Sequence, residues 1–161
     1  MRLVDELPAG HPARGWEFAS AGIAGLEGWP MDEGMAAELE VRGASAAGFV
    51  ASQVSGAVLR PADLVLTLET VHRAWILEEW PALVRRTLLL GQAGRLAPDL
   101  AGHDDVLIAA LKAHSGAAQP ADAVADPYRR GPAAAARAAS EIERALRAIL
   151  TAAGPSPLEA R

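Results

Sequence analysis

The feature that most constrains the fold is the run ADLVLTLETVHRAWILEEWP, residues 62–81. Residues 62–68 are mostly apolar and rich in branched side chains, which is typical of a parallel strand covered on both faces. The following residues predict a helix over 70–81, capped by Thr70 and ended before Pro81. A strand that leads at once into a helix indicates an α/β layer architecture with a mostly parallel sheet.

The rest of the chain supplies further elements of the same two kinds. Strands are predicted at 16–22 and 85–91, helices at 30–43, 106–114 and 133–152, and loops at 92–103 and 115–132. Asp32 is expected to cap the first of these helices, and Asp104 or Asp105 the second. The third is expected to present one apolar stripe, made of Ala135, Ala138, Ile142, Leu146 and Ile149. Residues 1–153 are expected to form a single domain and residues 154–161 a flexible tail.

Composition and charge exclude several classes of protein. The net charge of −5 and the pI near 5.3 argue against a nucleic-acid binder, which needs a basic face. No charge-free apolar run is long enough to span a bilayer, and the first 15 residues lack the apolar centre of a signal peptide. A cytoplasmic location without a membrane partner is therefore expected. The absence of cysteine excludes disulfides and thiolate chemistry within these 161 residues.

Motifs for cofactors and metals are weak in this chain. Neither glycine-rich phosphate-loop pattern occurs, and no cofactor is expected. The run HDD at 103–105 contains metal-ligand residue types, but further ligands at useful spacing are missing, so no metal site is predicted. Trp29, Trp75 and Trp80 are interpreted as packing residues.

The most suggestive polar stretch is VADPYRRG, residues 124–131. Pro127 would fix the backbone after Asp126, and Tyr128 could form a wall beside a substrate. The alternative is an ordinary Asp-Pro turn, which the tripeptide alone favours. His72 and Arg73 also have two interpretations: they could hold an anion, or they could be a solvated pair in the first turn of a helix.

Taken in order, WEFASAG, ADLVLTLETVHRAWIL and ADPYRRG resemble the low-molecular-weight protein tyrosine phosphatase family. FVASQV resembles a further family motif, with Ser52 where arginine is usual. The resemblance covers roughly residues 14–152 and implies a three-layer fold of the phosphotyrosine phosphatase I type. It also implies that Asp126 stands at the general-acid position, with Pro127 and Tyr128 in the substrate-binding loop.

One departure from the family governs the expected function. The family's first strand runs into a Cys-x5-Arg phosphate loop that should precede WEFASAG, and the 161 residues contain no cysteine. The resemblance then implies a catalytically inactive chain with a binding or regulatory role. The alternative is an active phosphatase, hydrolysing phosphotyrosine through a cysteinyl-phosphate, whose true N-terminus lies upstream. A phosphotyrosine protein or other phosphate-containing ligand is expected as partner only if the family site is completed.

The same departure implies a sheet reduced by the loss of its first strand. By analogy with the family, this strand would lie between those ending at Ser20 and Leu68. Its loss would expose sheet edges with unpaired backbone groups. The remaining strands would pair directly, accept a strand from another chain, or leave a groove. Self-association through exposed edges is therefore one expected outcome.

Overall fold

The computed structural model describes residues 2–24, 26–101, 104–116 and 118–154. The helices are α1 (Arg2–Asp5), α2 (Glu33–Val41), α3 (Gly56–Leu59), α4 (Thr70–Glu79), α5 (Leu90–Leu96), α6 (Asp104–Ala113) and α7 (Pro132–Ala152), and the strands are β1 (Val65–Thr67) and β2 (Thr87–Leu89). Four 3-10 helices complete the described elements: η1 (Pro12–Gly15), η2 (Pro81–Arg86), η3 (Ala97–Leu100) and η4 (Pro120–Asp122). The expectations for His103 and for a flexible tail beyond Gly154 lie outside the described residues, as do the capping side chains of Asp104 and Asp105.

The predicted strand and helix over 62–81 are confirmed, with one correction. β1 pairs with β2 in parallel, with Val65 opposite Thr87 and Thr67 opposite Leu89, and α4 follows β1 almost at once. The cap of α4 is Glu69 rather than Thr70, and the Glu69 side chain accepts no hydrogen bond from the first turn. The fold is therefore an α/β arrangement around a small parallel sheet, which has two strands in the described part of the chain.

The strand predicted at 16–22 is wrong. Only Gly22 makes a strand-like contact there, a single parallel bridge to Gln53. A strand needs a hydrogen-bonded neighbour along its length, and no described strand supplies one to this segment. The alternation of Trp16 and Phe18 instead brings two rings together, 6.2 Å apart between centroids, and leaves Phe18 47% exposed.

The loop predicted at 92–103 is also wrong, because α5 and η3 occupy most of it. Both glycines of GQAG, residues 91–94, serve close packing. A Cβ on Gly94 would lie 2.7 Å from the Cα of Ala145 in α7. Gln92 is fully buried, and its side-chain oxygen accepts a hydrogen bond from the backbone N–H of Leu89. Packing between α5 and α7 therefore decides the helix here against local propensity.

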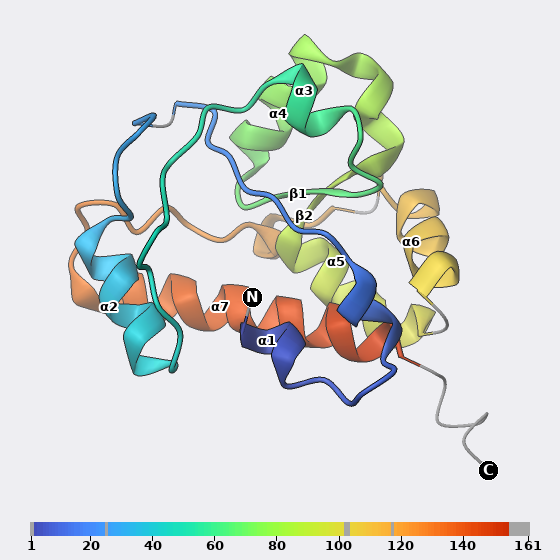
Figure 1. Ribbon diagram of the computed structural model, residues 1–161. Helices are drawn as coiled ribbons and strands as arrows, with labels where there is room; N and C mark the ends of the chain where they lie inside the picture. The colour runs from blue at the N-terminus through green and yellow to red at the C-terminus, as the bar shows by residue number, and fades with distance from the viewer. Residues whose placement is uncertain (1, 25, 102–103, 117, 155–161) are drawn as a thin grey trace.

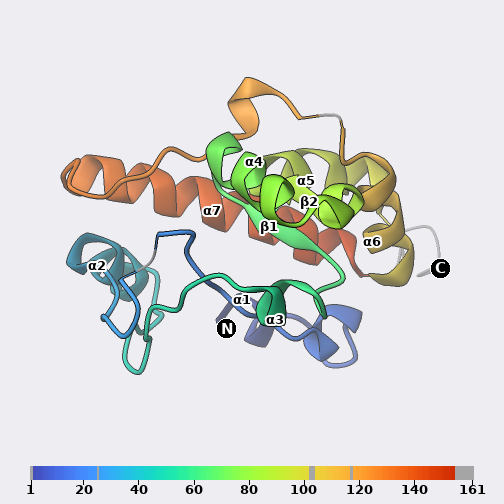
Figure 2. The same ribbon diagram turned by 90° about the horizontal axis from the view of Figure 1, so that it is seen from above.

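The long helix α7 forms one wall of the main core, and the predicted stripe along it is confirmed. Ala135, Ala138 and Ile149 are buried, and Ile142 and Leu146 pack partly buried against the core. Figure 1 shows α7 crossing beneath the sheet with α5 beside it. Figure 2 shows α1, α2 and α3 on one side of the molecule, opposite the loop of residues 118–131. No helix in the described ranges is long and apolar enough to cross a membrane.

The predicted capping of α2 by Asp32 is confirmed. The carboxylate of Asp32 accepts hydrogen bonds from the backbone N–H groups of Gly34 (3.0 Å) and Met35 (3.3 Å). None of the residues of α2 is buried. Polar contacts attach the helix to α7 instead: Arg42 donates to Glu143 (3.0 Å) and to the Ser140 hydroxyl (2.9 Å).

Candidate functional site

The loop that carries Asp126 is anchored to the end of the sheet. Immediately after β1, the carbonyl of Leu68 accepts a hydrogen bond from the N–H of Val124 at 2.8 Å. Val124 is 4% exposed, so this anchor is buried. One residue further on, the Glu69 carboxylate accepts a hydrogen bond from the backbone N–H of Asp126 at 3.3 Å. The carboxyl end of β1 thereby fixes where the loop begins, as expected for a site at the C-terminal edge of a parallel sheet.

The base of the loop is held by an ion pair between an exposed arginine and a buried aspartate, which the sequence analysis did not foresee. Arg95 of α5 donates from Nε to Oδ1 of Asp122 at 2.9 Å and from Nη2 to Oδ2 at 2.8 Å. Asp122 is 3% exposed, and it also accepts a 2.7 Å hydrogen bond from the N–H of Gln119. The Arg95 guanidinium holds the pKa of the Asp122 carboxyl below its ordinary value, although burial opposes the shift.

Asp126 itself forms a tight turn. Its Oδ1 accepts a hydrogen bond from the N–H of Tyr128 at 3.0 Å, which is the Asx-turn geometry that Asp-Pro sequences favour. The next residue, Arg129, has a positive φ of 58° and lies 5.0 Å from the centroid of the Tyr128 ring. Asp126 and Tyr128 are both exposed. The Asp126 side chain therefore lies at the surface, and one of its carboxylate oxygens accepts a hydrogen bond within the turn.

The histidine and arginine that begin α4 have different roles. The His72 Nε2 lies 3.6 Å from Oε2 of Glu69, so His72 belongs to the group around the loop. Arg73 instead donates to the carbonyls of Thr87 (3.0 Å) and Ser115 (3.3 Å). The guanidinium of Arg73 is thus occupied by backbone groups that join α4 to the first residue of β2 and to the segment after α6.

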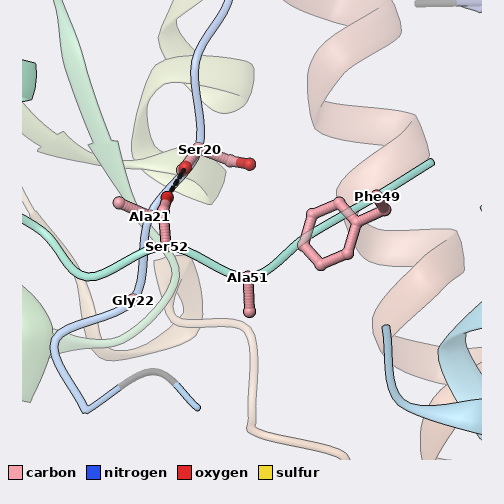
Figure 3. A pocket seen from close by; sticks show the side chains of 6 residues that line it. All are labelled: Ser20, Ala21, Gly22, Phe49, Ala51 and Ser52. Atoms are coloured by element: carbon pink, nitrogen blue, oxygen red, sulfur yellow. Dashed lines mark hydrogen bonds between the residues drawn. The ribbon is translucent and has the colours of Figure 1, made fainter. Parts of the chain in front are cut away.

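The stretch Ser20–Gly22 lines a hollow that is separate from the Asp126 loop. Figure 3 shows these residues with Phe49, Ala51 and Ser52, which together line a shallow pocket of about 260 Å³. The Ser52 hydroxyl donates to the carbonyl of Ser20 at 2.9 Å. Neither Asp126 nor Tyr128 lines this hollow. The structure thus brings Asp126 to Glu69, but it does not place it in the pocket beside Ser20.

Two of the three tryptophans behave as predicted, and one does not. Trp75 and Trp80 pack edge to face, with their ring centroids 5.7 Å apart, against the smaller core. Trp29 is 61% exposed. The interpretation of Trp29 as a packing residue is therefore wrong.

The arrangement of strand, helix and anchored loop defines a fold of the tyrosine phosphatase type. It matches the crystal structure of the Erwinia amylovora tyrosine phosphatase AmsI with a TM-score of 0.61, at 21% identity, over 82% of this chain and 71% of that chain. The profile of the family described as low molecular weight phosphotyrosine protein phosphatase matches residues 10–91. The chain belongs to this family.

One curated relative gives the scale of the similarity. The low molecular weight protein-tyrosine-phosphatase Ptp of Acinetobacter johnsonii is 31% identical over 86 residues, which cover 53% of this chain. The chain spans 61% of the length of that relative. The resemblance noted in the sequence is thereby confirmed at the level of family and fold.

Proposed function

We propose that this 161-residue chain acts as a binding or regulatory module of the phosphatase family and does not itself hydrolyse phosphotyrosine. The observation that carries the proposal is chemical. A cysteinyl-phosphate needs a thiolate nucleophile, and no residue of this chain is a cysteine. An acid at Asp126 can protonate a leaving group only when another group attacks phosphorus.

The geometry around Asp126 supports the same proposal. One carboxylate oxygen of Asp126 accepts a hydrogen bond from the N–H of Tyr128. The backbone N–H of Asp126 donates to the carboxylate of Glu69. The hydrogen bond that the Asp126 carboxylate accepts within the described residues therefore stabilises a turn. Asp126, Pro127 and Tyr128 remain the residues proposed to face a phosphorylated protein ligand. Asp126 would stand at the acid position, and Pro127 and Tyr128 would line the ligand-binding side of the loop.

The proposal is tested by offering the purified chain a phosphotyrosine peptide and an aryl phosphate. No release of phosphate above the buffer control is expected, with either the wild-type chain or Asp126→Asn. Hydrolysis by the wild-type chain that falls in Asp126→Asn would overturn the proposal, because it would show a working acid and a nucleophile other than cysteine.

A second candidate function is that of an active phosphatase in which these residues are part of a longer polypeptide. The anchored loop favours it, because Leu68 and the Arg95–Asp122 pair hold Asp126 in a fixed place. The coverage of 61% of the Acinetobacter johnsonii relative is also consistent with it. Reading the coding DNA upstream in frame tests this candidate: a stop codon before any Cys-x5-Arg coding stretch would eliminate it.

A further inference from the structure

An unusual share of the exposed apolar surface lies in one part of the chain. Six of the ten large apolar or aromatic side chains that are exposed in the described ranges fall within residues 18–50. They are Phe18, Leu26, Trp29, Val41, Phe49 and Val50, with exposed fractions between 36% and 82%. Figure 2 shows this part of the chain on the side of the molecule opposite the loop of residues 118–131. Large exposed apolar side chains that lie together mark interaction sites in folded proteins.

Backbone hydrogen bonds bring the centre of this surface together. The N–H of Gly28 donates to the carbonyl of Ala51 at 2.9 Å, and the N–H of Ala51 donates to the carbonyl of Trp29 at 2.8 Å. The turn that carries Leu26 and Trp29 is thereby joined to the segment that carries Phe49 and Val50. We call Leu26, Trp29, Phe49 and Val50 the apolar patch.

A hollow and a fixed backbone adjoin the apolar patch. Phe49 also lines the pocket beside Ser20–Gly22, whose walls are mainly apolar (Figure 3). The Trp29 side chain is 61% exposed, and its backbone is fixed, because it accepts from Ala51 and donates to the carbonyl of Leu26. An aromatic anchor next to a shallow hollow is the arrangement in which a few side chains carry most of a binding energy.

The charge of this segment is strongly one-sided. Residues 17–50 hold six carboxylates and a single guanidinium, so they carry the whole net charge of −5, while the other residues hold fourteen charges of each sign. The guanidinium, Arg42, is already paired with Glu38 and Glu143. Glu17, Glu27, Glu33 and Glu40 are exposed, and no ion pair is seen for them within the described residues. Glu27 lies between Leu26 and Trp29, in the turn that supplies these two residues to the apolar patch.

We propose that the apolar patch and its acidic surroundings form a docking surface for a positively charged polypeptide segment that carries large apolar side chains. Apolar anchors would cover Trp29 and Phe49, and lysine or arginine residues beside them would meet Glu27 and its neighbours. Opposite charge across an interface speeds association and excludes wrongly charged partners. The surface is separate from the Asp126 loop, so this binding does not depend on the proposed function.

The test uses three synthetic peptides of equal length and helical pattern: one of lysine and leucine, one of glutamate and leucine, and one of lysine and serine. Binding to the full chain is measured by titration calorimetry, and amide chemical shifts locate the site. The lysine–leucine peptide is expected to bind saturably and to shift residues 17–50. The other two are expected to bind at least about tenfold more weakly, because each lacks one half of the complementarity.

Matched variants distinguish specific binding at the apolar patch from non-specific binding to the chain. Trp29→Ser and Glu27→Gln are each expected to weaken binding about fivefold or more, while Val84→Ser and Glu79→Gln, exposed elsewhere, leave it unchanged. Circular dichroism checks that each variant is folded, and Leu26→Ser replaces Trp29→Ser if that variant unfolds. Asp126→Asn is expected to bind like the wild-type chain.

Four outcomes would overturn the proposal. One is equal binding of all three peptides, and another is an equal loss of binding in the control variants. A third is binding to neutral phosphatidylcholine vesicles in place of the peptide, which would make the patch a membrane contact. The last is a dimer in light scattering that Trp29→Ser dissolves, which would make a second copy of the chain the occupant.

Discussion

Arg95 donates hydrogen bonds to both carboxylate oxygens of Asp122, at 2.9 and 2.8 Å, and thereby joins α5 to the base of the loop that carries Asp126. Paired hydrogen bonds between a guanidinium and a carboxylate are stronger and more directional than those between neutral groups. The carboxylate is almost fully buried, whereas the guanidinium keeps contact with solvent. The pair is therefore the main polar anchor of the loop at its beginning.

Replacing Asp122 by asparagine is expected to destabilise the chain by about 2 kcal/mol near neutral pH, because it removes a charged acceptor from a buried site. Urea unfolding followed by circular dichroism measures this loss. Asp99→Asn is the matched control, because Asp99 is exposed in η3, and it is expected to change the free energy of unfolding little. Equal losses in the two variants would show that the Arg95–Asp122 pair has no special role.

The same pair predicts a dependence of stability on pH. The pKa of Asp122 is lowered in the folded state, chiefly by the hydrogen bonds from Arg95. Its stabilisation is therefore complete above the unfolded value of about 3.9, and it is lost as the pH falls from there toward the folded pKa. The difference in unfolding free energy between wild type and Asp122→Asn should be constant from pH 7 to pH 5 and should shrink below pH 4. A difference that grows on acidification contradicts this account.

The glycines of α5 give a packing prediction. A Cβ at position 91 would lie 2.4 Å from the carbonyl oxygen of Asp122, and one at position 94 would lie 2.7 Å from Ala145. Each substitution to alanine is expected to destabilise the chain by about 1–3 kcal/mol through overpacking. Gly116→Ala is the control, since no heavy atom lies within 4 Å of its added Cβ. Thermal melts of the three variants check the prediction, which fails if Gly94→Ala melts like Gly116→Ala.

The attachment of α2 depends on Arg42, because this helix has no buried residue. Arg42→Met removes the contacts to Glu38, Glu143 and Ser140 and is expected to cost about 1 kcal/mol or less, as for a partly exposed ion pair. Amide hydrogen exchange should rise in α2 without rising in α5. Arg137→Met, an exposed position on α7, should leave α2 unchanged, and faster exchange in both variants would argue against a specific attachment.

The sequence predicts elements best where one local signal decides them. The apolar run before Thr70, the Asp32 cap and the stripe along α7 each depend on neighbouring residues. Residues 16–22 and 92–103 were mispredicted because their structure depends on distant partners. Within residues 16–22 the one β-bridge is that of Gly22 to the distant Gln53. Ala145 approaches Gly94 so closely that only glycine fits.

For the candidate site, the sequence indicates Asp126 but not the contacts that position the loop around it. Asp-Pro-Tyr is a local pattern, and the Asx turn follows from it. Arg95 and Asp122 lie 27 residues apart, and neither stands in a motif. Asp122 stands in a loop rich in alanine and proline, and its burial, which requires a partner for the carboxylate, is visible only in the structure.

The central proposal is that these 161 residues, which carry the phosphatase fold and contain no cysteine, do not hydrolyse phosphotyrosine. It is tested most directly by a single-turnover experiment in which the purified chain is in molar excess over a phosphotyrosine peptide, with inorganic phosphate followed by phosphorus NMR. We predict that the peptide remains phosphorylated, and that wild type and Asp126→Asn are indistinguishable from buffer. Release of phosphate by the wild-type chain, diminished in Asp126→Asn, would contradict the account.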